Sequence, residues 1–160
     1  MKRKGFNQLE KLYFEDYEIG ETFVSPARTI TETDIVLFSA FTGDWHPLHT
    51  DAIYAEKTQF KGRIAHGMLG LVVGSALTTR LGPYAVLPKS FIAFYGMDSV
   101  RFTAPVKIGD TIHCEVKVTE LLVKDETRGV IGNENIIKNQ RGEPVIVFVA
   151  KILVGRKPKV

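Results

Sequence analysis

Residues 66 to 81 read HGMLGLVVGSALTTRL and are followed by Gly82-Pro83, a pair that ends helices. A helix formed by this segment is apolar on almost all faces, so it must be surrounded by protein. Its three glycines, at positions 67, 70 and 74, leave room for a strand or a ligand to approach closely. The segment therefore predicts a central helix that the rest of the chain covers.

Downstream of this helix the apolar period changes from that of a helix to that of strands. Between residues 112 and 118 apolar and polar residues alternate, which indicates a strand with one wet face. Upstream, residues 21–29 are strand-like until Pro26 interrupts them. Four or five antiparallel strands around one apolar helix make an α+β domain. The long strands are expected at residues 91–103, 110–123, 129–139 and 145–154.

Composition narrows the class of protein. The 160 residues contain no repeat, low-complexity tract or linker, so we expect one domain over residues 1–160. The net charge is +3, but the basic residues are scattered, which argues against a nucleic-acid partner. Cys114 is the only cysteine, which excludes an intrachain disulfide and favours a cytoplasmic protein. The N-terminus lacks the apolar region of a secretory signal, and no segment reaches the ~20 apolar residues of a membrane span, so no membrane crossing is expected.

The candidate functional residues lie mainly in the segment before the central helix. Capping residues at Thr31 to Asp34 and a stop at Gly43 predict a helix of about 10 residues. It leads into residues 43–49, GDWHPLH, where Pro47 breaks any continuing helix. The polar stretch up to Arg63 is expected to be a long functional loop, with one short helical turn near residues 51–57.

Two acids and two histidines crowd into eight residues of this loop: Asp44, His46, His49 and Asp51. His and Asp are good metal ligands, yet the spacing matches no zinc pattern and no further ligand is apparent, so we expect no metal. Alternatively, Asp44 and His49 flank one water, which the carboxylate orients while the imidazole exchanges its proton. A third interpretation is that Asp44 only stabilises a turn and the histidines are solvated.

The run GDWHPLH resembles the signature of the MaoC-like, type 2 or (R)-specific enoyl-CoA hydratases, in which Gly-Asp is followed by Asn-Pro, an aliphatic residue and His. The likeness continues at Phe41, at the IAHGML run of residues 64–69, and in the strand–turn–strand region from Arg101 to Asp110. It covers roughly residues 15 to 120.

This resemblance implies a hot-dog fold, an antiparallel sheet wrapped around a central helix. It places Asp44 and His49 at the catalytic pair, Gly67 at the backbone N–H that binds the thioester oxygen, and Ser75 at a serine supporting the site. The implied activity is reversible hydration of a trans-2-enoyl-CoA to an (R)-3-hydroxyacyl-CoA, with an acyl-CoA substrate and no cofactor. The family also implies a homodimer or higher homo-oligomer.

His46 departs from the family's pattern, because it stands where the family has Asn. We expect its imidazole to replace the hydrogen-bonding function of that amide near the substrate. The other histidines, His66 and His113, are interpreted as structural: His66 as part of the helix entry, His113 as a solvated strand position. The alternative functions are an acyl-CoA thioesterase of the same fold, a non-catalytic acyl-CoA-binding module, and a metal-binding protein.

Overall fold

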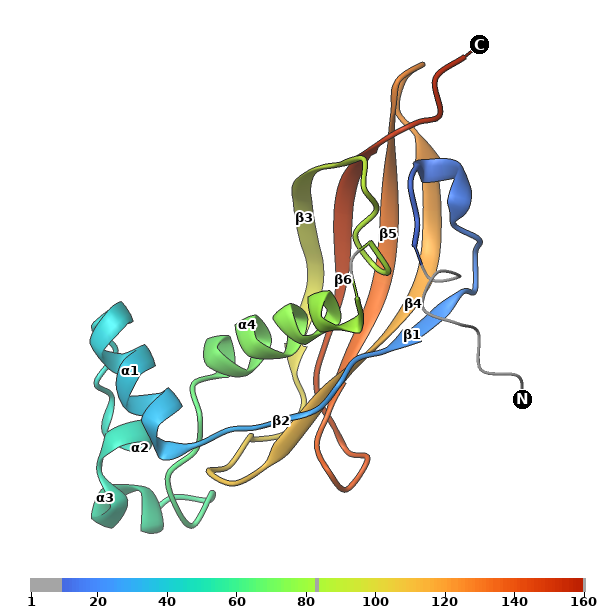
Figure 1. The fold of residues 1–160 in the computed structure, drawn as a ribbon. Coiled ribbons are helices and arrows are strands. Elements are labelled where there is room, and N and C mark those ends of the chain that lie inside the picture. The colour runs from blue at the N-terminus through green and yellow to red at the C-terminus, as the bar shows by residue number, and fades with distance from the viewer. Residues whose placement is uncertain (1–9, 83, 160) are drawn as a thin grey trace.

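A computed structural model of the chain describes residues 10–82 and 84–159. Its strands form one antiparallel sheet in which the long strands confirm the predicted ones to within a residue or two at each end (Figure 1). A short 3-10 helix, η2 (Phe14–Asp16), precedes the first strand. The order across the sheet is β1 (Thr22–Val24), β4 (Thr111–Val123), β5 (Arg128–Lys138), β6 (Pro144–Gly155) and β3 (Phe91–Phe102), with β2 (Arg28–Thr29) paired to β4.

Helix α4 (Gly67–Leu77) crosses one face of this sheet and continues into the 3-10 helix η3 (Thr78–Leu81) (Figure 1). Strands take up the space that the glycines leave. A Cβ added at Gly70 would lie 3.0 Å from the Ile146 side chain of β6, and one at Gly74 would overlap Ile137 of β5. The predicted hot-dog architecture, an antiparallel sheet around an apolar helix, is thus confirmed. Its core includes Leu69, Leu71 and Leu77 of α4 with Ile112, Val116, Ile131, Ile137 and Ile146 of the sheet.

One side of α4 differs from the prediction that protein surrounds the helix. Met68, Val72 and Ala76 recur at intervals of four residues and are exposed, Met68 and Val72 each to 54%. Because the sheet of one chain covers only the opposite side of the helix, this apolar stripe faces outward. A monomer therefore leaves part of its most apolar helix uncovered.

Helix α1 (Glu32–Thr42) forms where the sequence predicts it. A capping box begins it: the Thr31 backbone N–H donates to Asp34 at 2.8 Å, and the Asp34 N–H donates to the Thr31 hydroxyl at 3.3 Å. Gly43 ends the helix in the left-handed conformation, with φ +77°, which glycine adopts without strain. The capping box and Gly43 therefore fix the two ends of α1 and place Asp44 directly after it.

The long irregular loop predicted after Asp44 contains two short helices, α2 (Pro47–Thr50) and α3 (Ala52–Glu56). The second confirms the predicted turn near residues 51–57. The first was not expected, because Pro47 was taken to break a helix; it instead occupies the first helical position, where its missing N–H costs nothing. Figure 1 shows α1, α2 and α3 grouped beyond the N-terminal end of α4.

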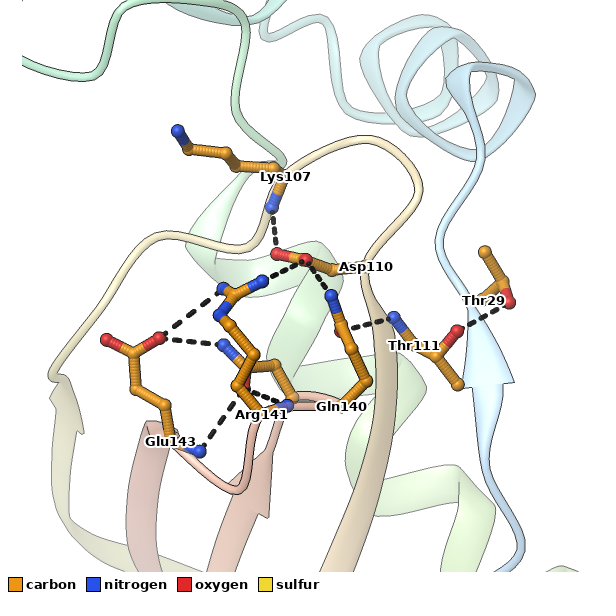
Figure 2. Close-up of polar contacts among 8 residues, drawn as sticks. Thr29, Lys107, Asp110, Thr111, Gln140, Arg141 and Glu143 are labelled. Atoms are coloured by element: carbon orange, nitrogen blue, oxygen red, sulfur yellow. Dashed lines mark hydrogen bonds and ion pairs between the residues drawn. The ribbon is translucent and has the colours of Figure 1, made fainter.

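The turn between β3 and β4 is fastened to the turn between β5 and β6 by the buried carboxylate of Asp110 (Figure 2). This carboxylate accepts hydrogen bonds from the Lys107 backbone N–H at 2.8 Å, from Gln140 at 2.7 Å and from Arg141 at 3.2 Å. Burial acts to raise the pKa of Asp110, but these donors outweigh it and hold the pKa below its ordinary value. These hydrogen bonds therefore hold the β3–β4 turn and the β5–β6 turn together.

Among residues 10–82 and 84–159, no helix has both the length and the apolar character needed to cross a membrane.

Candidate active site

The N-terminus of helix α2 holds His49 in place. His46 is the N-cap residue, and its Nδ1 accepts a hydrogen bond from the Leu48 backbone N–H at 3.1 Å. The backbone N–H of His46 in turn donates to the Asp44 carboxylate at 3.2 Å. An imidazole nitrogen thus caps the helix as an amide oxygen would. His46 itself is exposed, and its ring centre lies 6.1 Å from that of His49.

The hydrogen bonds of His49 determine which ring nitrogen carries its proton. Nδ1 lies 2.8 Å from the Ile64 carbonyl oxygen. Because a carbonyl can only accept, Nδ1 must donate, which leaves Nε2 with a free lone pair. Burial lowers the pKa of His49, and the Ile64 carbonyl, which raises it, offsets this only in part. His49 is therefore a neutral imidazole near pH 7, with Nε2 able to accept a proton.

His66, at the N-terminal end of α4, lies in a cluster with Asp44 and His49, although the sequence interpretation treated it only as part of the helix entry. It is only 3% exposed, and its ring stacks on that of His49 with centres 3.8 Å apart. Its Nε2 lies 3.0 Å from the Asp44 backbone carbonyl oxygen and 3.3 Å from the Ser39 hydroxyl. His66 thus touches both members of the predicted catalytic pair. The available signal was its position directly before Gly67, in a run the family shares.

Asp44, His49 and His66 come together although they are separated in sequence by up to 22 residues. A carboxylate oxygen of Asp44 and one ring nitrogen from each histidine all lie within 4.8 Å of one another. Two hydrogen bonds of about 2.8 Å that meet at a roughly tetrahedral angle span ~4.6 Å, so a separation in the upper part of this range allows one water to bridge the carboxylate and an imidazole. The side chain of Asp44 remains half open to solvent.

The same three residues satisfy the simplest spacing requirement of a metal site, but their hydrogen bonds fit a metal poorly. His66 uses Nε2 to donate to the Asp44 carbonyl. The two rings are stacked at an interplanar angle of 28°, and imidazole lone pairs lie in the ring planes, so they point side by side rather than at one ion. A water held by hydrogen bonds fits this arrangement better than a cation.

A cavity of about 460 Å³ adjoins this cluster, within the usual range for small-molecule sites. His49, His66 and Gly67 line it together with mainly apolar residues. Asp44 does not line the cavity, but its carboxylate lies close to the two histidines that do. The β3–β4 turn that Asp110 fastens supplies one wall, from Thr103 to Val106. The apolar lining includes Phe60, Ile64, Met68, Phe102 and Ile146.

Gly67 is the first residue of α4 and lines the cavity. The N–H groups of a first helical turn have no partner within the helix, and the positive end of the helix dipole lies there. A Cβ added to Gly67 would lie 2.9 Å from two atoms of the Phe102 ring, so only glycine leaves both the ring and the N–H in place. This N–H can stabilise negative charge that develops on a bound carbonyl oxygen.

The two remaining predicted residues are placed less directly. Ser75 lies two turns further along α4, is half-buried and donates to the Val72 carbonyl at 3.1 Å; it does not line the cavity described above. His113 is half-buried on β4, with a ring nitrogen 3.4 Å from the Glu115 carboxylate. The structure therefore brings Asp44 to His49 beside the cavity that His49 and Gly67 line, and leaves Ser75 outside this group.

Comparison with known proteins gives a consistent picture. A family model described as "MaoC like domain" matches residues 15–140. A protein of Rhodospirillum rubrum named "(R)-specific enoyl-CoA hydratase" is 45% identical over 112 residues, which make up 69% of this chain and 72% of that protein.

Two solved structures are similar over nearly the whole chain. One, described as a monoamine oxidase regulatory protein from Archaeoglobus fulgius, has a TM-score of 0.87 at 42% identity and covers 93% of this chain and 97% of that one. The other, described as R-hydratase PhaJ1 from Pseudomonas aeruginosa in the unliganded form, has a TM-score of 0.74 at 35% identity and covers 92% and 88%.

Proposed function

Because the chain belongs to the MaoC-like domain family, we propose that it catalyses the reversible syn hydration of a trans-2-enoyl-CoA to an (R)-3-hydroxyacyl-CoA. The observation that carries this proposal is the spacing of Asp44 and His49, whose carboxylate oxygen and ring nitrogen lie within 4.8 Å beside an apolar cavity. Relatives named as (R)-specific hydratases support the substrate class and the configuration.

In the proposed mechanism one water lies between Asp44 and His49. The carboxylate accepts one of its hydrogens, and Nε2 of the neutral His49 removes the other proton as the water oxygen bonds to C3. The electron pair of the C2–C3 double bond moves toward the thioester, and the Gly67 N–H stabilises the enolate oxygen. A proton then returns from the pair to C2 on the same face, so that addition is syn and the site is regenerated.

Apolar surfaces on the molecule support a homodimer. Strand β3 ends the sheet order, and no other described strand pairs with its outer edge. Several of its large apolar residues are exposed, including Ile92 to 50% and Phe94 to 57%. A second copy joined at this edge pairs the unsatisfied backbone groups and covers the exposed stripe of α4.

Oligomeric state is tested separately from activity. Sedimentation of the purified protein should give about twice the 17.9 kDa of one chain, or a higher multiple. Phe94→Lys on β3 should shift the mass toward the monomer. Leu122→Lys on β4, a matched control because Leu122 is 53% exposed, should not. A wild-type monomer at micromolar concentration would contradict this part of the proposal.

The cytoplasm is the compartment we propose. Cys114 is the single cysteine of the chain and is buried and unpaired, so the fold requires no oxidising environment.

The test of the activity is a product assay with a short trans-2-enoyl-CoA. Loss of the conjugated-enoyl absorbance should accompany formation of a 3-hydroxyacyl-CoA of (R) configuration, and a metal chelator should leave the rate unchanged. Release of free CoA thiol would assign the protein to the thioesterases instead. Tight binding of acyl-CoA with no turnover would indicate a binding or regulatory module.

A further inference from the structure

The stacked histidines carry opposite tautomers. The Ile64 carbonyl fixes the proton of His49 on Nδ1, whereas the Asp44 carbonyl fixes that of His66 on Nε2. Nδ1 of His66 is buried and has no hydrogen-bond partner among the described residues. The polar contacts of the His66 ring to described residues are therefore made through Nε2.

The contacts of His66 exceed what packing alone requires. Its ring packs between Phe38 of α1, at 5.0 Å between centres, and His49 of α2, at 3.8 Å. Its one donor reaches the backbone of Asp44, 22 residues earlier in the chain. A buried apolar residue would fill the same space but would not hold that backbone. Both groups proposed to bind the water thus depend on one side chain that contacts each of them.

We propose that His66 is a positioning residue that sets the separation of Asp44 and His49: its Nε2–H holds the Asp44 backbone, and its ring covers one face of the His49 imidazole. This inference rests on the hydratase function proposed above. Two separable roles follow. The hydrogen bond to Asp44 keeps the carboxylate within reach of the water, and the stacked ring keeps His49 out of solvent, where an imidazole is more readily protonated.

The titratable groups around His49 bear on the second role. They are Asp44 from the preceding loop, His46 from the start of α2, and His66 from α4. Asp44 favours the protonated form of His49, and the two histidines oppose it. Because burial is the largest contribution to the lowered pKa of His49, uncovering its ring should raise that pKa.

Two substitutions separate the roles. His66→Phe keeps an aromatic ring on His49 but has no donor for the Asp44 carbonyl; we expect kcat to fall at least tenfold while the acid limb of the kcat/KM profile moves less than in the second variant. His66→Gln keeps a donor of similar reach but uncovers His49; we expect the acid limb to move to higher pH. In both variants KM should change less than kcat. A role in stability alone would lower the yield of folded protein without moving the limb.

His113→Phe and His113→Gln are matched controls, because His113 is half-buried on β4 and does not line the cavity. They should retain the wild-type rate and profile. If both His66 variants keep kcat/KM within twofold and the acid limb in its wild-type position, the proposal is wrong.

Histidine NMR of the wild-type protein tests the inference without any variant or substrate. Nitrogen shifts should report Nδ1–H for His49 and Nε2–H for His66, with His49 titrating below an ordinary histidine. The opposite tautomer of His66 would overturn the positioning role even if its variants fail to fold. Wild-type protein with these tautomers but no hydratase activity would overturn the proposed function and leave the positioning geometry intact.

Discussion

Replacing His46 with asparagine should leave the enzyme active, although the substitution lies beside the proposed catalytic pair, Asp44 and His49. His46 caps α2 through an Nδ1 that accepts from the Leu48 N–H at 3.1 Å. The amide oxygen of Asn can accept the same bond, and Asn is among the best N-cap residues. We therefore expect His46→Asn to retain kcat/KM within about tenfold, equivalent to ~1.4 kcal/mol, with an unchanged pH profile.

Alanine at the same position removes the acceptor. Loss of an N-cap costs about 0.5–2 kcal/mol, typically ~1 kcal/mol. Because α2 spans only Pro47–Thr50 and carries His49, much of that loss should appear as disorder of the His49 imidazole. We expect kcat/KM of His46→Ala to fall about fivefold further than that of His46→Asn, the equivalent of ~1 kcal/mol.

The assay measures steady-state hydration of an enoyl-CoA by the wild type, His46→Asn and His46→Ala over a range of pH. Equal rates for the Asn and Ala variants would show that the cap does not matter. A fall of a hundredfold or more in His46→Asn, or loss of one limb of its profile, would make His46 a proton-transfer group and refute the capping role.

Three further outcomes are expected. Asp110→Asn should lower the free energy of unfolding by about 1–3 kcal/mol in denaturant titrations, because it weakens buried hydrogen bonds. Asp98→Asn is the control: Asp98 forms an exposed ion pair with Lys151, so the free energy of unfolding should change by less than about 0.5 kcal/mol. The acid limb of the kcat/KM profile should lie below pH ~6.5, because burial lowers the pKa of His49. The stability linked to neutral His49 is present above pH ~6.5 and is lost as the pH falls through the pKa of His49 in the folded protein. An acid limb above pH ~6.5 would contradict a buried His49 base. Gly67→Ala should lower kcat at least tenfold, since its methyl group would meet the Phe102 ring at 2.9 Å, and a wild-type rate would exclude the proposed oxyanion contact.

Local patterns in the sequence predicted most of the fold. The alternation at residues 112–118 and the evenly spaced turns located the long strands, and the all-apolar run after His66 located α4. Each of these signals depends on neighbours within a few residues. Helix α2 was missed because four residues are too few to show a period, and because Pro47 has opposite meanings at the start and in the interior of a helix.

Patterns among neighbouring residues could not predict contacts between segments that are distant in the sequence. The stack of His66 on His49 arises only when α4 and α2 meet in the fold, so a lone histidine at a helix entry looked structural. The exposed stripe of Met68, Val72 and Ala76 likewise depends on which side of α4 the sheet covers. The approach of Asp44 to His49 was predictable because they lie five residues apart in a recognisable motif.

A double-mutant cycle on Asp44 and His49 tests the central claim most directly. Asp44→Asn and His49→Ala should each lower kcat by roughly 10²–10⁴-fold, the range for loss of a positioned acid or base. Because the proposed mechanism has both residues act on one water, the double variant should lose far less than the product of the two single losses. Two small effects that multiply in the double variant would show that Asp44 and His49 do not work as a pair.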